Sequence, residues 1–296
     1  MESNYGTLLG GGYFFEAPRW HEGRWWVSDQ DAKAVYSIDP NGDLRTIADV
    51  PGRPSGLGWL PEGDLLVCSM DDNTLFRVQA GGALSVHSDL AALAVGNIND
   101  MVVAADGTAY VGCTGMSDDS PDTIVTATRL IQVDPDGRAR HTGQPLVCAN
   151  GAAIDTQQRT LYVGESLAGR YTAFDIAPDG SLCDARVWAQ LSPPSIGSTV
   201  ADVYVALEFV PDGCARDADG RIWSADLKGR RCCLVEAGGV IVTELAAPDG
   251  LAFIACALGG PDGRTLLLCA SPGWDPESRM RRESVLLTTR VSVGAG

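Results

Sequence analysis

The chain has 296 residues, of which 45% are hydrophobic and 20% charged, a balance typical of a soluble globular protein rather than a disordered one. Its 22 basic and 38 acidic residues give a net charge of −16, which argues against nucleic-acid partners and against an anionic membrane surface. The sequence shows neither about 18 consecutive apolar residues nor a secretory signal. We therefore expect a cytoplasmic protein with no membrane partner, whose nine scattered cysteines are reduced thiols.

One phrase recurs along the chain: a turn, usually with Gly, followed by a short strand rich in aromatic and aliphatic residues. Six copies occur, at residues 21–28, 61–68, 105–112, 157–164, 218–225 and 261–268. Their strands begin about 40 to 61 residues apart, and a propeller blade of four antiparallel strands takes about 40–50 residues. The sequence thus predicts an all-β fold, a six-bladed β-propeller that forms one domain over residues 1–296. A β-sandwich with accidental internal similarity is the alternative.

A second strand follows most copies and ends at another turn. Apolar and polar residues alternate over 34–42, 74–78, 129–137 and 171–180, and most of these segments close with Asn-Gly or Asp-Gly, which is the signature of a β-hairpin. Strand patterns also occur near both ends, at 5–9 and 284–293, so we expect the two termini to share one blade and hide its edges. The best helical candidate, 90–94, is a single turn.

A polar residue stands at the same distance before the turn in several copies. Eight residues before the turn Gly, or before the Gln that replaces it, are Ser55, Asn99, Asn150 and Asp212, and Glu16 stands seven before the first. In a propeller the same register in each blade means the same height near the axis. We therefore predict that these oxygen atoms converge at one end of the central channel. The sixth copy is less regular and offers Asp249.

Two carboxylates and two amide oxygens form a set of ligands that suits a hard divalent cation, and such a cation would relieve the repulsion between buried carboxylates. The alternative is that Asn150-Gly151 and Asp212-Gly213 are ordinary turn sequences, since Asn and Gly both tolerate the left-handed region. The recurrence of the register across blades favours the metal site.

The segments 15–20, Asn99-Asp100, Asn150-Gly151 and 211–213 give the chain a resemblance, over about residues 10 to 290, to the senescence marker protein/gluconolactonase (regucalcin-like) family of six-bladed propellers. The resemblance implies a metal-dependent hydrolase of a lactone or related ester. It implies that Glu16, Asn150 and Asp212 bind one divalent cation, Ca²⁺ before Zn²⁺, Mn²⁺, Mg²⁺ or Fe²⁺. It further implies that Asp212 is the general base or nucleophile, and that Asn99 lies beside the cation and holds substrate.

One departure from the family pattern bears on the substrate. Sugar-lactone members carry an Arg two positions before the Asn of the Asn-Asp pair, where this chain has Asn97. The segments expected at the mouth are partly apolar: 13–15, Trp59 and Trp274. We therefore predict a lactone or ester less polar than an aldonolactone. The expected substrate-binding residues are Asn97, Asn99, Asp100 and Phe15.

Several points stay open at this level. The protein could instead be a non-catalytic, metal-stabilised propeller, either a Ca²⁺-binding or a partner-binding scaffold, or a phosphotriesterase-like hydrolase on the same ring. Residues 190–204 could form a lid or a plain surface insertion, and the basic run 279–282 is interpreted as a solvated hairpin tip. Cys232 and Cys233 are interpreted as strand-face residues rather than a redox pair. We expect a monomer or a weak homo-oligomer.

Overall fold

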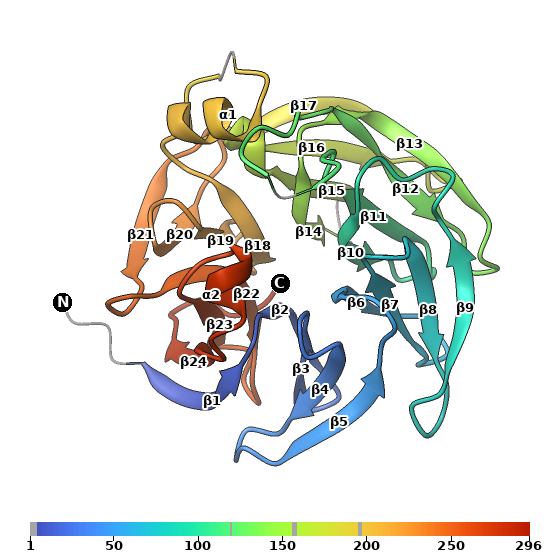
Figure 1. The fold of residues 1–296 in the computed structure, drawn as a ribbon, viewed down its shortest axis with the longest axis vertical. Helices are drawn as coiled ribbons and strands as arrows, with labels where there is room; N and C mark the ends of the chain where they lie inside the picture. The colour runs from blue at the N-terminus through green and yellow to red at the C-terminus, as the bar shows by residue number, and fades with distance from the viewer. Residues whose placement is uncertain (1–4, 119, 156–158, 195–196) are drawn as a thin grey trace.

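The structure, a computed structural model, describes residues 5–118, 120–155, 159–194 and 197–296. Over these residues the strands form six four-stranded antiparallel sheets. Figure 1 shows the sheets arranged as blades around a central axis. The predicted six-bladed, all-β propeller is confirmed, and the β-sandwich alternative is wrong.

Each blade runs from an innermost strand outward. Blade 1 consists of β2 (Phe15–His21), β3 (Arg24–Asp29), β4 (Ala34–Ile38) and β5 (Leu44–Asp49). Blade 2 consists of β6 (Pro54–Trp59), β7 (Leu65–Ser69), β8 (Thr74–Val78) and β9 (Leu84–Asp89). Blade 3 consists of β10 (Ile98–Val103), β11 (Ala109–Cys113), β12 (Thr128–Val133) and β13 (Ala139–Leu146). Blade 4 consists of β14 (Ala149–Asp155), β15 (Thr160–Glu165), β16 (Arg170–Ile176) and β17 (Leu182–Gln190). Blade 5 consists of β18 (Pro211–Arg216), β19 (Ile222–Asp226), β20 (Arg231–Val235) and β21 (Ile241–Ala246).

Blade 6 is built from both ends of the chain. It consists of β22 (Ala252–Gly259), β23 (Thr265–Ser271), β24 (Ser284–Arg290) and, as its outermost strand, β1 (Gly6–Gly12). β1 pairs antiparallel with β24, and Gly6 lies opposite Thr288. The prediction that the two termini share a blade is confirmed.

The repeated phrase of the sequence is the second strand of every blade together with the turn before it: β3, β7, β11, β15, β19 and β23. The segments that follow it form the third strands β4, β8, β12 and β16. Residues 157 and 158, which belong to the turn of the fourth copy, lie outside the described residues. Residues 90–94 form one turn, in which the amide groups of Leu93 and Ala94 both donate to the carbonyl of Leu90.

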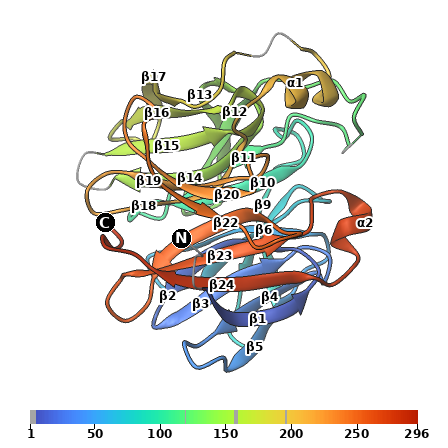
Figure 2. The same cartoon turned by 90° about the vertical axis from the view of Figure 1, so that its left-hand side faces the viewer.

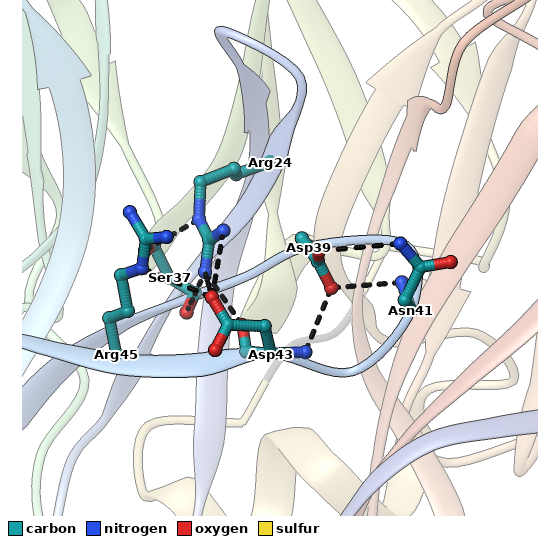
Figure 3. A network of polar contacts seen from close by, with 6 residues as sticks. All are labelled: Arg24, Ser37, Asp39, Asn41, Asp43 and Arg45. Atoms are coloured by element: carbon teal, nitrogen blue, oxygen red, sulfur yellow. Dashed lines mark hydrogen bonds and ion pairs between the residues drawn. The ribbon is translucent and has the colours of Figure 1, made fainter.

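The Asp-Pro-Asn-Gly turn between β4 and β5 shows why these sequences make hairpins (Figure 3). One Asp39 carboxylate oxygen accepts hydrogen bonds from the amide groups of Asn41 and Asp43, at 2.9 and 2.8 Å. Gly42 takes a φ of 90°, which a residue with a side chain rarely adopts. Arg24 on β3 then donates to the carbonyl of Asp43 at 2.6 Å and joins the turn to the body of blade 1.

The hydrophobic core lies within and between the blades. Cys232 and Cys233 follow one another on β20, so their side chains point to opposite faces of the strand. Cys232 packs in the cluster shared with β22 and β23, whereas Cys233 packs with Tyr171 and Phe209. Both are fully buried and neither is in a disulfide, which supports the interpretation as strand-face residues.

Helix is confined to connections between strands. These are a 3-10 turn (Ser166–Ala168), α1 (Val200–Ala206) and α2 (Pro276–Arg279), and none of the helices described here has the length and apolar character needed to cross a membrane. Figure 2 shows α1 and α2 on the same face of the ring. α1 overlaps the segment 190–204, for which no helix was expected; residues 195 and 196 of that segment lie outside the described residues.

Candidate functional site

The predicted register is realised in the innermost strands. Each of five polar residues is the second residue of the innermost strand of its blade; these residues are Glu16, Ser55, Asn99, Asn150 and Asp212. In blade 6 the corresponding strand begins with Ala252, followed by the buried residues Phe253 and Ile254. Asp249 lies ahead of that strand and is exposed. Five blades therefore present a polar side chain at one height, and the sixth presents none.

The Asn-Gly and Asp-Gly pairs are not turns. Asn150-Gly151 and Asp212-Gly213 lie inside β14 and β18, and both glycines keep a negative or extended φ. A Cβ atom on Gly151 would lie 2.4 Å from the carbonyl oxygen of Asp212, and one on Gly213 would lie 2.4 Å from the Cβ of Ala255. The glycines are required because neighbouring innermost strands approach closely here. The turn alternative is wrong for both pairs.

Glu16 and Asp212 are carboxylates in a buried, mutually repulsive setting, with side chains only 5% and 7% exposed. Burial raises the pKa of Glu16 well above its usual range, and the negative charges of Asp212 and Asp100 raise it further. Burial also raises the pKa of Asp212 to about 7, although a hydrogen bond from the Asn150 side chain acts in the opposite direction. Ionisation of both groups therefore calls for a positive charge nearby.

Asp100 is committed to a different contact. It is 3% exposed, and its carboxylate accepts from the Arg19 guanidinium at 2.7 Å and from the amide of Met101 at 2.8 Å. It is not among the residues that line the pocket described below. That Asp100 binds substrate stays a prediction; in the structure its charge acts on Glu16 and Asp212.

Asn99 is oriented by blade 2. The Ser55 hydroxyl donates to Asn99 Oδ1 at 3.0 Å, and the Ser28 hydroxyl donates to the Ser55 carbonyl at 2.6 Å. Because the amide oxygen of Asn99 already accepts from Ser55, its NH₂ group is the part best placed to donate to a ligand.

A cavity of about 140 Å³ opens over these side chains. Its lining includes Glu16, Asn99, Asn150 and Asp212 together with Phe14, Gln30, Arg53, Met70, Thr114, Met116, Cys148, Ser166, Leu167, Val200, Tyr204, Val210, Leu227, Trp274 and Arg279. The predicted polar residues of blades 1, 3, 4 and 5 are therefore brought together in one pocket. Val200 and Tyr204 belong to α1, so the segment 190–204 contributes a wall of this pocket rather than a remote insertion.

Of the aromatic residues expected at the mouth, some line the pocket and others pack elsewhere in the blades. Phe14 and Trp274 line the pocket. Phe15, expected to contact substrate, is 2% exposed and packs in the cluster that contains Trp25. Trp59 stacks on His21 with ring centroids 4.0 Å apart and does not line the pocket.

Asn97, also expected to contact substrate, does not line the pocket either. Its backbone amide donates to the hydroxyl of Thr114 at 3.1 Å, and it is Thr114 that reaches the pocket.

Arg279 was missed. The run 279–282 was expected to be a solvated tip, but Arg279 is 7% exposed, lines the pocket and donates to both carboxylate oxygens of Asp31, at 2.7 and 2.9 Å. Its guanidinium also lies 5.2 Å from the centroid of the Phe14 ring. A local signal existed, because Asp275 and the following proline form a helix start that places Arg279 in an ordered turn.

The donor set fits a hard cation on chemical grounds. Glu16 and Asp212 supply carboxylates, and Asn150 uses its NH₂ group on Asp212 and so keeps its amide oxygen available. Among the described residues there is no group of three or more His, Cys, Asp or Glu side chains arranged to hold a metal. Any cation here would therefore depend on amide oxygens as well as on carboxylates.

The fold and the site together define a six-bladed propeller with a polar floor at one end of its axis. The sequence model described as SMP-30/Gluconolactonase/LRE-like region matches residues 14–271, so the chain belongs to this family. No curated protein matches the chain significantly.

Solved structures with the same fold include a luciferin-regenerating enzyme (17% identity, 99% of this chain and 97% of that one, TM-score 0.79). They also include a gluconolactonase from Xanthomonas campestris (21% identity, 98% and 90%, TM-score 0.73) and regucalcin, a calcium-binding protein from Agrobacterium tumefaciens (17% identity, 100% and 96%, TM-score 0.79). At these identities the likeness establishes the fold alone.

Proposed function

We propose that this protein hydrolyses a lactone or related carboxylic ester with the help of one divalent cation, Ca²⁺ being the first candidate. The observation that carries the proposal is the pair of buried carboxylates, Glu16 and Asp212, at the floor of the pocket. Within the described part of the chain neither carboxylate forms an ion pair. The charge of Arg19 and a hydrogen bond from the amide of Ala17 lower the pKa of Glu16, yet it stays well above its usual range. Membership of the family and the gluconolactonase and regucalcin neighbours support the same function.

The side chains would divide the work as follows. Glu16, Asn150 and Asp212 would hold the cation. When bound, a divalent cation polarises a carbonyl and lowers the pKa of water. Asp212 would accept the proton of the attacking water or attack the carbonyl itself, and Asn150 would keep its carboxylate in place. Asn99, held by Ser55, would donate its NH₂ group to the substrate.

The proposal is tested with protein purified without chelator. We expect metal analysis to find about one divalent ion per chain. Calcium should raise the melting temperature of the wild type and should do so less in Glu16→Gln. A panel of lactones and aryl esters should be hydrolysed, and EDTA should abolish this activity. Asp212→Asn should fold and lose hydrolysis by about 10²–10⁴-fold, the usual contribution of a positioned base.

The matched control is Asp249→Asn, which removes an exposed acid outside the pocket and should leave both the metal response and turnover unchanged. Near wild-type turnover in Asp212→Asn would overturn the role given to this residue. Stabilisation by metal without hydrolysis of any lactone, ester or phosphotriester would instead favour the non-catalytic scaffold. Hydrolysis confined to phosphotriesters would favour the phosphotriesterase-like alternative.

A further inference from the structure

One side of the pocket is almost entirely apolar. We call it the apolar wall, and it consists of Met116, Leu167, Val200, Tyr204, Val210 and Leu227. All of these residues except Val200 belong to one packed cluster that also contains Val203 and Leu207, so the wall is backed by packed side chains rather than by solvent. A polar substrate group placed against it would lose its hydrogen bonds to water and gain none in return.

The α1 part of the wall is fixed by contacts on several sides. The amide of Val200 donates to the carbonyl of Thr123 at 2.9 Å, which ties the start of α1 to the loop between β11 and β12. At the other end Lys228 donates to the carbonyl of Tyr204 at 2.7 Å, and its ammonium lies 5.2 Å from the centroid of the Tyr204 ring. Val200 and Tyr204 are therefore held toward the pocket by contacts to blades 3 and 5.

The two arginines that line the pocket already have carboxylate partners. Arg279 makes two hydrogen bonds to Asp31, and Arg53 donates to Asp71 at 2.8 Å. A substrate anion would have to compete with these carboxylates for the guanidinium groups. The pocket therefore favours a neutral substrate over an anionic one.

We infer that the substrate is a neutral lactone or ester with an apolar substituent that packs on the apolar wall, and that Val200 and Tyr204 determine this specificity. The inference rests on the proposed function and deepens it. It also gives a physical reason to expect poor use of polyhydroxylated aldonolactones, whose hydroxyl groups would face Leu167, Leu227 and their neighbours.

The test uses the wild-type protein with γ-lactones of increasing alkyl chain length, from γ-valerolactone to γ-nonalactone, and D-glucono-δ-lactone for comparison. Each methylene buried on the wall should raise kcat/KM by about fourfold until the pocket is filled. A value independent of chain length, or a preference for glucono-δ-lactone, would overturn the inference.

Variants of α1 assign the effect to the wall. Tyr204→Ala and Val200→Ala should flatten the dependence on chain length while the shortest lactone is still hydrolysed, and Tyr204→Phe should retain the wild-type dependence. Val205→Ala is the matched control, because Val205 lies on the same helix but is 77% exposed. Equal slopes in Tyr204→Ala, Val200→Ala and Val205→Ala would overturn the assignment to Val200 and Tyr204. Circular dichroism confirms that each variant is folded.

Failure of this inference can be told apart from failure of the proposed function. Calorimetry with the corresponding γ-alkyl lactams, which are not hydrolysed, measures binding alone. If no lactone is turned over but lactam affinity rises with chain length and falls in Tyr204→Ala, the hydrolase proposal fails and the apolar ligand class stands. If lactones are hydrolysed but neither rate nor lactam affinity depends on chain length, the hydrolase proposal stands and this inference fails.

Discussion

Glu16 and Asp212 lie in a pocket where burial destabilises their charged forms. Their pKa values are raised chiefly by the loss of water and further by neighbouring carboxylates, of which Asp100 acts on both. Asp100 itself is satisfied by Arg19 and stays out of the pocket. The site thus stores an electrostatic penalty that a bound cation would remove, which links ligand binding to folding stability.

This penalty predicts a pH dependence for protein treated with a chelator. The folded-state pKa of Asp212 is about 7 and that of Glu16 is also raised, whereas unfolded carboxyls titrate near about 4. Between these values the folded state binds more protons than the unfolded one, so stability falls as pH rises through this window. Between pH 5.5 and pH 8, Asp212 alone would lower the free energy of unfolding by about 2 kcal/mol. Urea unfolding at pH 5.5 and pH 8 measures the loss, and calcium should reduce it.

Asp212→Asn serves as the control for this prediction. The amide does not titrate, so the difference between the two pH values should shrink in the variant. An unchanged difference would mean that other groups, within a chain of net charge −16, cause the whole effect.

At the scale of the elements, the innermost strands depend on glycine. Gly151 and Gly213 lie where one innermost strand meets the next, and both fall within a register shift of the antiparallel pairing. The irregular pairing allows the preceding polar residue, Asn150 or Asp212, to reach the pocket while the strand continues.

Gly213→Ala should therefore lower the free energy of unfolding by about 1–3 kcal/mol, because the new Cβ would overlap the Cβ of Ala255. Gly10→Ala is the control, since Gly10 also lies in a strand but a Cβ atom added to it would meet nothing within 4 Å. Urea midpoints compare the two variants with the wild type. Equal urea midpoints in Gly213→Ala and Gly10→Ala would show that the blades can move apart without a loss of stability.

The sequence predicted the strands and the inner register because both are periodic. The repeated turn and strand fix the second strand of each blade, and counting back from the turn finds Asn99, Asn150 and Asp212. The residues of the loops do not recur at a fixed spacing, so their positions could not be predicted in this way. Which of two adjacent aromatics, Phe14 or Phe15, faces the pocket depends on packing against blade 6 and not on spacing.

The two short helices illustrate the same limit. Thr199 caps α1 by accepting from the amide of Asp202, and Asp275 caps α2 by accepting from the amide of Ser278. These caps are visible in the sequence and could have indicated helix starts. That the helices place Tyr204 and Arg279 in one pocket, however, follows from contacts between distant blades, which no local pattern reports.

At the scale of the whole molecule, blade 6 is completed by a strand from the other end of the sequence. β1 covers the outer edge of β24, and Tyr5 donates its hydroxyl to the carbonyl of Ala246 in blade 5. Without β1 the backbone groups of β24 would be free to pair with another chain. The pairing of β1 with β24 therefore adds to the packing of β2 on blade 6 in closing the ring.

Deletion of residues 1–12 should lower the melting temperature and make the protein associate as its concentration rises, because the edge of β24 is uncovered. Thermal denaturation and size-exclusion chromatography over a range of concentrations measure both effects. A synthetic peptide of residues 5–12 should reverse this association. A truncated protein with the same stability and the same elution behaviour as the full chain would show that closure does not need β1.

The pairing of β1 with β24 also sets the order of events during synthesis. The strand at residues 6–12 leaves the ribosome before blades 1 to 5, yet its partner at residues 284–290 is translated after them. Blades 1 to 5 can each assemble from contiguous sequence as they emerge, while β1 waits unpaired until residues 284–290 have emerged. Nascent chains stalled before residue 284 should therefore have an open ring, and they are the species on which chaperones would act.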